Sequence, residues 1–364
     1  FRNHDPKRED IQQTKAALAM CENIDWNVGR IMQKVEESGL SEKTIIIYLS
    51  DNGPNTWRWN DGMKGKKGST DEGGVRSPLI MKWEGSFKAG KNIPQIASIL
   101  DLFPTLIDIT KIDFEPQKAL DGKSLKPLLL EENPNWDDRF IINHWRRTSI
   151  RSQKYRLDYA GKLFDMTNDP GQTTDIADKK PEDAKQLSHA LETWKNDVLS
   201  ELPETDERPF TIGASGFSFS QIPARDGTAT GEIERSDNSP NCTFFTNWIN
   251  INDSIYWPVE VLQSGNYEVE LYYTCPAEDV GSTIQLSIGK SKITTQITEA
   301  HNPPLKGMEN DRILRTQSYV KDFKKINIGQ IQLEKGKGIL CLKALGIPGT
   351  QVMDFRLLMF NRIS

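Results

Sequence analysis

Cysteine is scarce in this sequence, and its spacing excludes two common uses of the residue. The chain has four cysteines in 364 residues, at Cys21, Cys242, Cys275 and Cys341, and none of them forms a Cys-x-x-Cys pair. Neither a zinc site nor a dense disulfide framework is therefore indicated. The three cysteines after residue 240 leave two possibilities open, namely one disulfide bridge or reduced positions in a protein core.

Long apolar runs and an excess of positive charge are also missing. No segment approaches the roughly 18 apolar residues that cross a bilayer, so the sequence predicts no membrane span. The net charge of −5 argues against a nucleic-acid partner, and the basic loop at residues 64–67 is too short to reverse it. With 36% hydrophobic and 27% charged residues, the composition is that of a globular protein of two domains.

The most informative segment, residues 44–78, begins with a short apolar run. Residues 44–49 are rich in β-branched side chains and lack polar alternation, which favours a strand covered on both faces in a parallel sheet. Open α/β sheets place their ligands just past the carboxyl ends of such strands. There Asp51 and Asn52 offer a carboxylate and an amide oxygen, which suit Ca²⁺ or Mg²⁺, although two oxygens do not complete a cation site.

A loop rich in glycine and lysine follows. Three lysines alternate with three glycines: Lys64, Lys66 and Lys67 with Gly62, Gly65 and Gly68. Backbone N–H groups and ammonium groups can both approach an anion closely in such a loop, so a tetrahedral anion held between a metal and a lysine is one interpretation. The other is structural, because Asn-Gly is a frequent hairpin turn and glycine-lysine stretches are often solvated loops.

Two ordered motifs in this segment carry a resemblance to a known family. They are Asp51-Asn52-Gly53 and Lys67-Gly68-Ser69-Thr70-Asp71-Glu72-Gly73-Gly74-Val75-Arg76-Ser77-Pro78. Together they resemble the second half of the core of a type I sulfatase, of the arylsulfatase family in the alkaline phosphatase superfamily. The resemblance implies an α/β catalytic domain in which Asp51 and Asn52 ligate Ca²⁺ and Lys67 contacts the sulfate. Lys64 and Lys66 have no counterpart in the family and are interpreted as loop charges.

The flanking sequence before and after the two motifs extends the resemblance. Apolar residues recur at three- and four-residue steps from Ala17 to Val35, which predicts an amphipathic helix ending near Gly39. Residues 23–30 resemble the sulfatase helix at this place, and Asp25 within them is interpreted as structural. Residues 101–106 also look like the family. They begin a predicted helix whose core-facing residues are expected to be Leu102, Phe103, Leu106 and Ile107.

The end of the predicted catalytic domain has its own signature. Residues 150–157 and 163–170 are similar to the small antiparallel sheet and the Asp-Pro turn that close the sulfatase domain. A helix is predicted over residues 181–199, with Leu187, Leu191, Trp194 and Val198 on one face. The resemblance thus covers roughly residues 8–202, and we expect residues 1–202 to be the carboxyl-terminal part of a sulfatase catalytic domain.

The nucleophile of the family is not found in this sequence. In type I sulfatases it is a formylglycine made from the Cys or Ser of a Cys/Ser-x-Pro-x-Arg motif, and no such motif occurs here. The amino-terminal pair of calcium-binding aspartates, the first sulfate-binding lysine and the histidine before the long helix are not found either, and His4 lies in a different setting. The sequence begins at Phe1 without a methionine, so we expect part of a longer sulfatase that is inactive alone.

The resemblance implies hydrolysis of a sulfate ester, either of a sulfated glycan or of an aryl sulfate, and export to the periplasm or the cell exterior. A phosphatase or phosphodiesterase of the same superfamily stays open, although four histidines are few for its two-metal clusters. A catalytically dead relative or a lectin-like module that binds sulfated glycan is the third possibility. Turnover of sulfate esters, turnover of phosphate esters and binding without turnover would separate the three.

Two further segments are candidates for contact with the substrate. Trp57, Arg58, Trp59 and Asn60 come directly after the metal pair, where an arginine and aromatic rings can contact a sugar or its charged groups. His144 follows a strand-like apolar run and is a candidate for the pocket lining, although a histidine in such a place also serves as a structural hydrogen-bonding group.

The chain changes character after a polar, unperiodic linker at residues 203–209. Eight short segments of strand character follow, at 217–222, 256–262, 267–274, 283–288, 292–297, 326–333, 339–345 and 352–360. They predict an antiparallel sandwich or jelly roll over residues 210–364. Residues 265–281 resemble the carbohydrate-binding-like sandwiches of glycan-degrading enzymes. Trp248, Tyr256 and Trp257 are candidates for stacking on sugar rings, with core packing as the alternative, so the domain either binds glycan or braces the catalytic domain.

Overall fold

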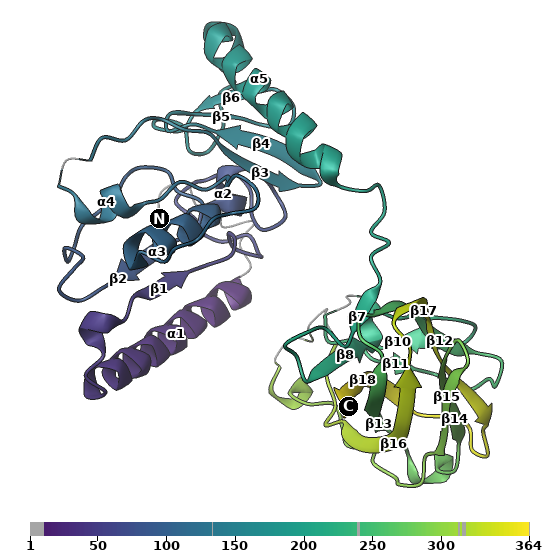
Figure 1. The fold of residues 1–364 in the computed structure, drawn as a ribbon. Helices are drawn as coiled ribbons and strands as arrows, with labels where there is room; N and C mark the ends of the chain where they lie inside the picture. The colour runs from purple at the N-terminus through teal and green to yellow at the C-terminus, as the bar shows by residue number, and fades with distance from the viewer. Residues whose placement is uncertain (1–10, 133, 239–240, 312–313, 315–317, 364) are drawn as a thin grey trace. The chain divides into compact units, whose positions relative to one another are not determined.

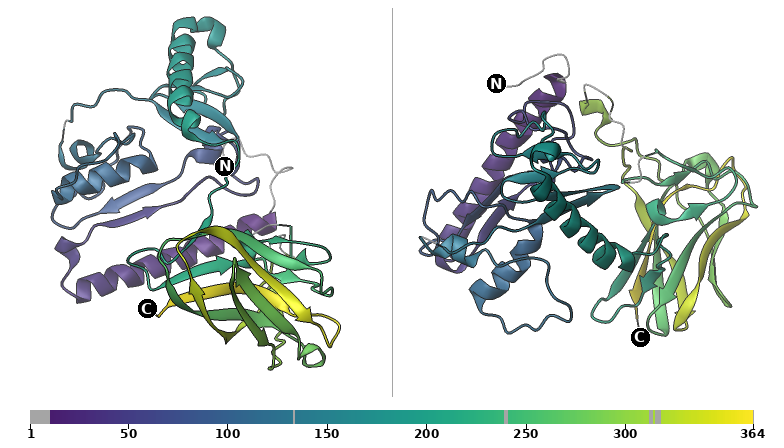
Figure 2. Two further views of the ribbon diagram at one scale, coloured as in Figure 1. Left: turned by 45° about the vertical axis from the view of Figure 1, so that its right-hand side comes forward. Right: turned by 90° about the horizontal axis from the view of Figure 1, so that it is seen from above.

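The computed structural model describes residues 11–132, 134–238, 241–311, 314 and 318–363. The chain divides into two compact units between Pro203 and Glu204, within the stretch predicted as a linker (Figure 1). The first unit combines helices with short strands, and the second is built almost entirely from strands (Figure 2). Among the described residues, no helix has the length and apolar character that crossing a membrane requires.

The first unit begins with the long helix α1, Ile11–Glu37, which runs beside strands β1, Ile46–Leu49, and β2, Leu79–Lys82 (Figure 1). The predicted helix and its end are confirmed. Gly39 follows the helix with a left-handed φ of 66°, a conformation that glycine adopts without strain. No side chain of α1 is buried in this structure, so its apolar residues contribute little to the described core.

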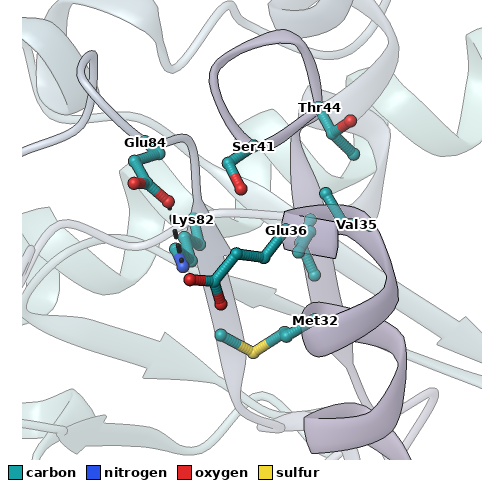
Figure 3. A pocket seen from close by; sticks show the side chains of 8 residues that line it. Met32, Val35, Glu36, Ser41, Thr44, Lys82 and Glu84 are labelled. Atoms are coloured by element: carbon teal, nitrogen blue, oxygen red, sulfur yellow. Dashed lines mark ion pairs between the residues drawn. The ribbon is translucent and has the colours of Figure 1, made fainter. Parts of the chain in front are cut away.

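A small pocket of about 50 Å³ marks where α1 meets the two strands (Figure 3). Its lining residues come from α1, β1, β2 and the connecting turns: Met32, Val35, Glu36, Ser41, Thr44, Ile46, Lys82 and Glu84. Lys82 Nζ lies 3.5 Å from Glu84 Oε2. The space holds a few water molecules but no sugar ring, so we assign it to imperfect packing.

Strand β1 differs from the prediction of a covered strand in a parallel sheet. It pairs with β2 in antiparallel register, with Ile47 opposite Met81, and its side chains are half-buried or exposed. The apolar run correctly indicates a strand. However, the direction of the partner depends on which segment returns to the strand edge, and here the chain comes back through β2 after the loop at residues 50–78.

Three short helices follow the first strand: α2 at Glu72–Val75, α3 at Leu102–Thr110 and α4 at Lys126–Leu130. The rotation of α3 about its axis differs from the prediction. Phe103 is half exposed, while Thr105 and Ile109 are the residues that face the interior. Asp101 sets this orientation, because its buried carboxylate accepts hydrogen bonds from Ser98 N at 2.7 Å and from Arg139 Nη1 at 2.8 Å.

The small antiparallel sheet predicted at the end of the first unit is confirmed. Its strands, in spatial order, are β3 (Ile141–Trp145), β4 (Arg147–Arg151), β5 (Tyr155–Leu157) and β6 (Leu163–Asp165). Helix α5, Pro181–Val198, packs on this sheet through Leu187 and Leu191, which share a buried cluster with Ile150 and Leu163. In the Asp-Pro turn, the Asp169 carboxylate accepts a hydrogen bond from Thr173 N at 2.8 Å.

The second unit contains two six-stranded sheets. In the first sheet the strands lie in the order β10 (Glu234–Arg235), β11 (Phe245–Thr246), β18 (Asp354–Arg362), β13 (Gly265–Thr274) and β16 (Lys324–Leu333). Strand β8 (Phe219–Pro223) also pairs with β18. In the second sheet the order is β15 (Ser291–Gln296), β14 (Thr283–Ile288), β17 (Gly336–Gly346), β12 (Ser254–Val261) and β7 (Phe210–Ile212). Strand β9 (Thr228–Ala229) also pairs with β12. The eight predicted strands are all present, and one hydrophobic cluster joins residues of both sheets.

Among the described strands of the second unit the pairing is antiparallel with one exception, since β7 runs parallel to β12. Strands β7, β9, β10 and β11 were not predicted. They have only two or three residues each, which is too short for side-chain alternation to show in a sequence. The described part of the chain therefore has a partial α/β unit followed by a largely β unit.

Two of the three proposed sugar-stacking residues are core residues instead. Trp248 and Trp257 are completely buried. The Trp257 ring lies 5.8 Å from the Phe355 ring, and its Nε1 donates a hydrogen bond to Pro223 O at 3.1 Å. Tyr256 directly precedes Trp257 on β12 and stays half-buried. All four cysteines are free, and Cys275 is buried. Of the two possibilities that the sequence left open, the structure therefore favours reduced cysteines over a disulfide bridge.

Candidate functional site

The turn after β1 is held against the second motif by backbone contacts. Gly53 N donates a hydrogen bond to Gly74 O at 2.9 Å, and Ser77 Oγ donates to Ser50 O at 2.7 Å. A Cβ atom at Gly53 would lie 1.9 Å from Gly73 O, so only glycine allows this approach. The glycines of the two motifs are thus required for their contact, which explains both stretches of sequence together.

A pocket of about 440 Å³ opens beside this turn. Its lining comes from the turn, from the following loop and from the glycine-lysine loop: Ser50, Asp51, Asn52, Gly53, Pro54, Asn55, Arg58, Trp59, Asn60 and Lys67. The structure therefore brings Asp51, Asn52 and Lys67 to one pocket, although Lys67 comes 15 to 16 residues after the other two in the sequence. Arg58 and Trp59 line the same pocket.

The three lysines of the loop lie in different settings. Lys64 Nζ lies 3.4 Å from Asp71 Oδ1 and 3.9 Å from Asp158 Oδ2, and Lys66 Nζ donates a hydrogen bond to Asn55 O at 3.0 Å. The exposed Lys67 has its backbone held by Pro54 O at 2.9 Å, while its ammonium group has no partner among the residues that the structure describes. Lys67 is thus the lysine of this loop whose charge is available to an anion.

Asp51 and Asn52 meet part of the requirement of a hard cation. Both line the pocket, and neither side chain makes a hydrogen bond or ion pair within the described ranges. A carboxylate and an amide oxygen are donors that Ca²⁺ accepts, but it takes six to eight oxygens in all. No group of three or more His, Cys, Asp or Glu residues suited to a metal exists in the described part of the chain. The two residues therefore fit a shared calcium site and do not form a complete one.

A buried charged cluster anchors the second motif to the small sheet. Glu72 Oε2 accepts a hydrogen bond from Arg156 Nη2 at 2.8 Å and lies 3.4 Å from Arg151 Nε. Arg156 Nη1 also donates to Thr70 O at 2.8 Å, and Ser149 Oγ donates to the same oxygen at 2.7 Å. Strands β4 and β5 thereby fix the segment that follows Lys67.

Glu72 and Arg156 have no role predicted from the sequence, although both lie in segments that resemble the family. The available signal was Arg156 between two apolar residues in a short strand, because an arginine in a buried strand needs an acidic partner. Which acid fills that role could not be read from the sequence, since 84 residues separate the pair.

The ionisation of Glu72 follows from this cluster. Burial by itself would raise the pKa of its carboxyl group, but Arg156, Arg151 and Arg76 act in the opposite direction and hold the pKa below the ordinary value of 4.5. Glu72 is therefore charged at neutral pH and neutralises part of the positive charge of Arg151, Arg156 and Arg76.

The remaining candidates for substrate contact are not all at the pocket. His144 lies on β3 outside the pocket lining, with its Nδ1 2.9 Å from Thr148 Oγ1 and its ring 6.2 Å from the Trp194 ring. Trp57 is likewise not among the lining residues, whereas Asn60 is. The structure thus separates His144 from the group formed by Asp51, Asn52, Arg58, Trp59 and Lys67, whose functional roles stay predictions.

Comparison with known proteins agrees with the two motifs. The model of the sulfatase family matches residues 1–112, and the model of the N-sulphoglucosamine sulphohydrolase C-terminal region matches residues 62–197. Residues 1–197 are thus part of a sulfatase domain. These matches end before the division between the two units, so the sulfatase part is the first unit.

Curated relatives extend the same likeness. A sulfatase of Formosa agariphila is 28% identical over 228 residues, which are 52% of this chain and 41% of that protein. Human arylsulfatase A is 40% identical over 112 residues, or 29% of this chain and 22% of that protein. Mouse steryl-sulfatase is 29% identical over 133 residues, covering 34% of this chain and 21% of that protein. The chain thus spans about a fifth to two fifths of the length of these relatives.

A solved structure shows a partial likeness of the same kind. The protein in the crystal structure of Ps i-CgsB is 26% identical to this chain, with a TM-score of 0.47, and the match covers 53% of this chain and 45% of that one.

Proposed function

We propose that the first unit is the sulfate-binding part of an enzyme that hydrolyses sulfate esters. The observation that carries this proposal is the unpartnered ammonium group of Lys67 in one pocket with Asp51 and Asn52. Lysine donates charge-assisted hydrogen bonds, which are the strong kind, and a sulfate group presents oxygens that accept them. The matches to the two sulfatase models support the choice of sulfate over other tetrahedral anions.

The proposed roles of the residues follow from their chemistry. Asp51 and Asn52 would hold Ca²⁺ together with other ligands, and the ion would supply positive charge beside the sulfate when bound. Lys67 donates to a sulfate oxygen and stabilises the negative charge that develops there. The chain has no Cys/Ser-x-Pro-x-Arg motif, so binding and charge stabilisation are what we propose for it, with formylglycine as the family nucleophile and no turnover by this chain alone.

For the substrate we propose a sulfated glycan, with an aryl sulfate as a smaller surrogate. The match to the N-sulphoglucosamine sulphohydrolase model supports a sulfated sugar, and the name arylsulfatase A supports an aryl sulfate. The pocket adds a half-exposed indole, Trp59, beside the proposed sulfate position, and an indole provides a flat apolar face for a sugar ring. Export to the periplasm or the cell exterior stays a prediction from the family resemblance.

The deciding assay compares three outcomes in the complete protein. Hydrolysis of sulfate esters with little hydrolysis of the matching phosphate esters is the expected result. Preferential phosphate-ester hydrolysis would favour a phosphatase or phosphodiesterase of the same superfamily. Binding of sulfated glycan without any turnover would favour the non-catalytic relative.

Replacing Asp51 by alanine is expected to remove the stabilisation by calcium. A ligand that binds the folded state raises the melting temperature with concentration, so Ca²⁺ should stabilise the wild-type complete protein, and this shift should vanish in Asp51→Ala. Asp25→Ala is the control, because Asp25 is an exposed acid on α1 outside the pocket. A calcium shift of equal size in wild type and Asp51→Ala would contradict the metal assignment.

For the second unit we propose a carbohydrate-binding-like sandwich of jelly-roll type. Two facing sheets with one shared core support the sandwich, and Tyr256 is the stacking candidate that remains outside the core. Deleting residues 204–364 should preserve hydrolysis of a small aryl sulfate and weaken action on a sulfated polymer. Loss of both activities would indicate that this unit braces the catalytic domain instead.

A further inference from the structure

Arg58 is a pocket residue whose hydrogen-bonding capacity is not used by the described protein. Its Nε atom is buried without a hydrogen-bond partner, and its guanidinium group makes no ion pair with any described residue. Buried polar atoms are hydrogen-bonded in the great majority of cases, so each exception asks for an explanation. Arg58 lines the pocket together with Lys67, and a ligand in that pocket can supply the missing acceptor.

The guanidinium group selects a particular kind of acceptor. It is planar and presents paired N–H donors that match the two oxygens of a carboxylate or a sulfate, whereas the lysine ammonium is a compact point charge. In the proposed function Lys67 already holds the sulfate that is cleaved. Arg58 comes from a different segment, the loop at residues 54–60, so the two cations approach the pocket from separate places in the chain.

The charge of the pocket also favours a substrate with more than one negative group. Asp51 is the one acidic residue in the described lining, while Arg58 and Lys67 are both basic. The proposed Ca²⁺ would be held by Asp51 and would add further positive charge. A substrate with a single sulfate leaves part of this charge uncompensated, and a second anionic group compensates it.

We propose that Arg58 is a specificity-determining residue that binds a second anionic group of the substrate, carried by the same sugar or its neighbour. The favoured substrate class is therefore a polyanionic glycan, in which a second sulfate or a uronate carboxylate accompanies the sulfate ester. Trp59 follows Arg58 in the chain and lines the same pocket, so it places a ring face next to the proposed anion site. This inference rests on the proposed function, because it takes the pocket as the sulfate site.

The test compares sugars that differ in their number of anionic groups. Glucosamine 6-sulfate carries one sulfate, glucosamine 2-N,6-O-disulfate carries two, and a 2-sulfated uronate carries a sulfate and a carboxylate. Dissociation constants and kcat/KM are measured for the complete protein in its wild-type, Arg58→Gln, Arg58→Lys and Lys66→Gln forms. Lys66→Gln is the matched control, because Lys66 is a loop cation held by Asn55 O and lies outside the pocket lining.

The expected result is a selective loss in Arg58→Gln. The dissociation constant for at least one of the two dianionic sugars should rise about 10- to 100-fold, the range for a lost charged hydrogen bond, while that for glucosamine 6-sulfate changes less than about threefold. Arg58→Lys should recover part of the loss, and Lys66→Gln should resemble wild type. The dianion that responds identifies the second group as sulfate or carboxylate.

Three results would overturn the proposal. Equal losses for the singly and doubly charged sugars would show that Arg58 holds the cleaved sulfate itself. If the wild-type protein bound all three sugars with equal affinity, the pocket would have no second anion site. A lowered melting temperature in both Arg58 variants without any change in charge preference would show that Arg58 pairs with a protein group. Binding constants decide these points without turnover, so an inactive protein would contradict the proposed function and still test Arg58.

Discussion

Replacing Glu72 by alanine is expected to destabilise the first unit by about 3–5 kcal/mol, the usual cost of removing one partner from a buried ion pair. Glu72 is 5% exposed and Arg156 is 2% exposed, so water cannot replace the lost carboxylate. The substitution would leave Arg156 and Arg151 side by side without a counter-charge. It would also remove the carboxylate contacts with strands β4 and β5, so that the hydrogen bonds from Arg156 and Ser149 to Thr70 O would remain to hold the motif after Lys67.

Calorimetric unfolding of the whole protein measures this effect, because the transition of the first unit is the one that should move. Glu84→Ala is the matched control. Glu84 also pairs with a basic residue, Lys82, at 3.5 Å, but both side chains are about half exposed. Exposed pairs contribute about 0–1 kcal/mol, so the control should melt near wild type. If both variants melt alike, the buried cluster is not what anchors the loop.

The same cluster predicts how stability depends on pH. A carboxyl group whose pKa is lower in the folded state than in the unfolded state stabilises the fold above the unfolded pKa, and this contribution is lost as the pH falls through the folded pKa. For Glu72 the loss should begin as the pH drops below about 4.5. Wild type and Glu72→Gln should therefore differ most near neutral pH and converge in acid, and a constant difference would argue against a charged Glu72.

Local sequence patterns predicted the helices and strands themselves better than the contacts between them. The apolar steps from Ala17 to Val35 predicted α1 and its end, and the Leu187 to Leu191 spacing predicted the buried face of α5. Both depend on residues close in the chain. The partner of β1 and the rotation of α3 were wrong, because each is decided by a distant contact, the return of β2 in one case and the Arg139 contact with Asp101 in the other.

The candidate site shows the same division. Asp51, Asn52 and Lys67 could be selected from two motifs, and the structure places all three at one pocket because the glycines of these motifs touch. For Trp248 and Trp257 the sequence left sugar stacking and core packing both open, since an aromatic residue near a strand looks alike in sequence whether it faces the core or the surface, and the structure places both in the core. Glu72 went unassigned because its meaning depends on two arginines that come 79 and 84 residues later.

Replacing Lys67 by alanine is expected to lower kcat for sulfate-ester hydrolysis by about 100- to 1,000-fold, the cost of removing one donor that stabilises developing charge. The loss should be large because the ammonium of Lys67 has no described protein partner to compete with the substrate. Lys67 is exposed and outside the Glu72 cluster, so the variant should keep its melting temperature. Loss of turnover with unchanged stability would separate a role in catalysis from a role in folding.

The neighbouring lysines make this prediction specific. Lys66→Ala removes a cation one residue away whose ammonium is already bound to Asn55 O, and kcat should change less than about threefold. Lys64→Ala removes the contacts with Asp71 and Asp158, so its effect should appear in the melting temperature before it appears in turnover. Equal losses of kcat in all three variants would mean that the loop acts through its total charge. In that case the sulfate is attracted by the field of the loop, and Lys67 does not hold it by a directed hydrogen bond.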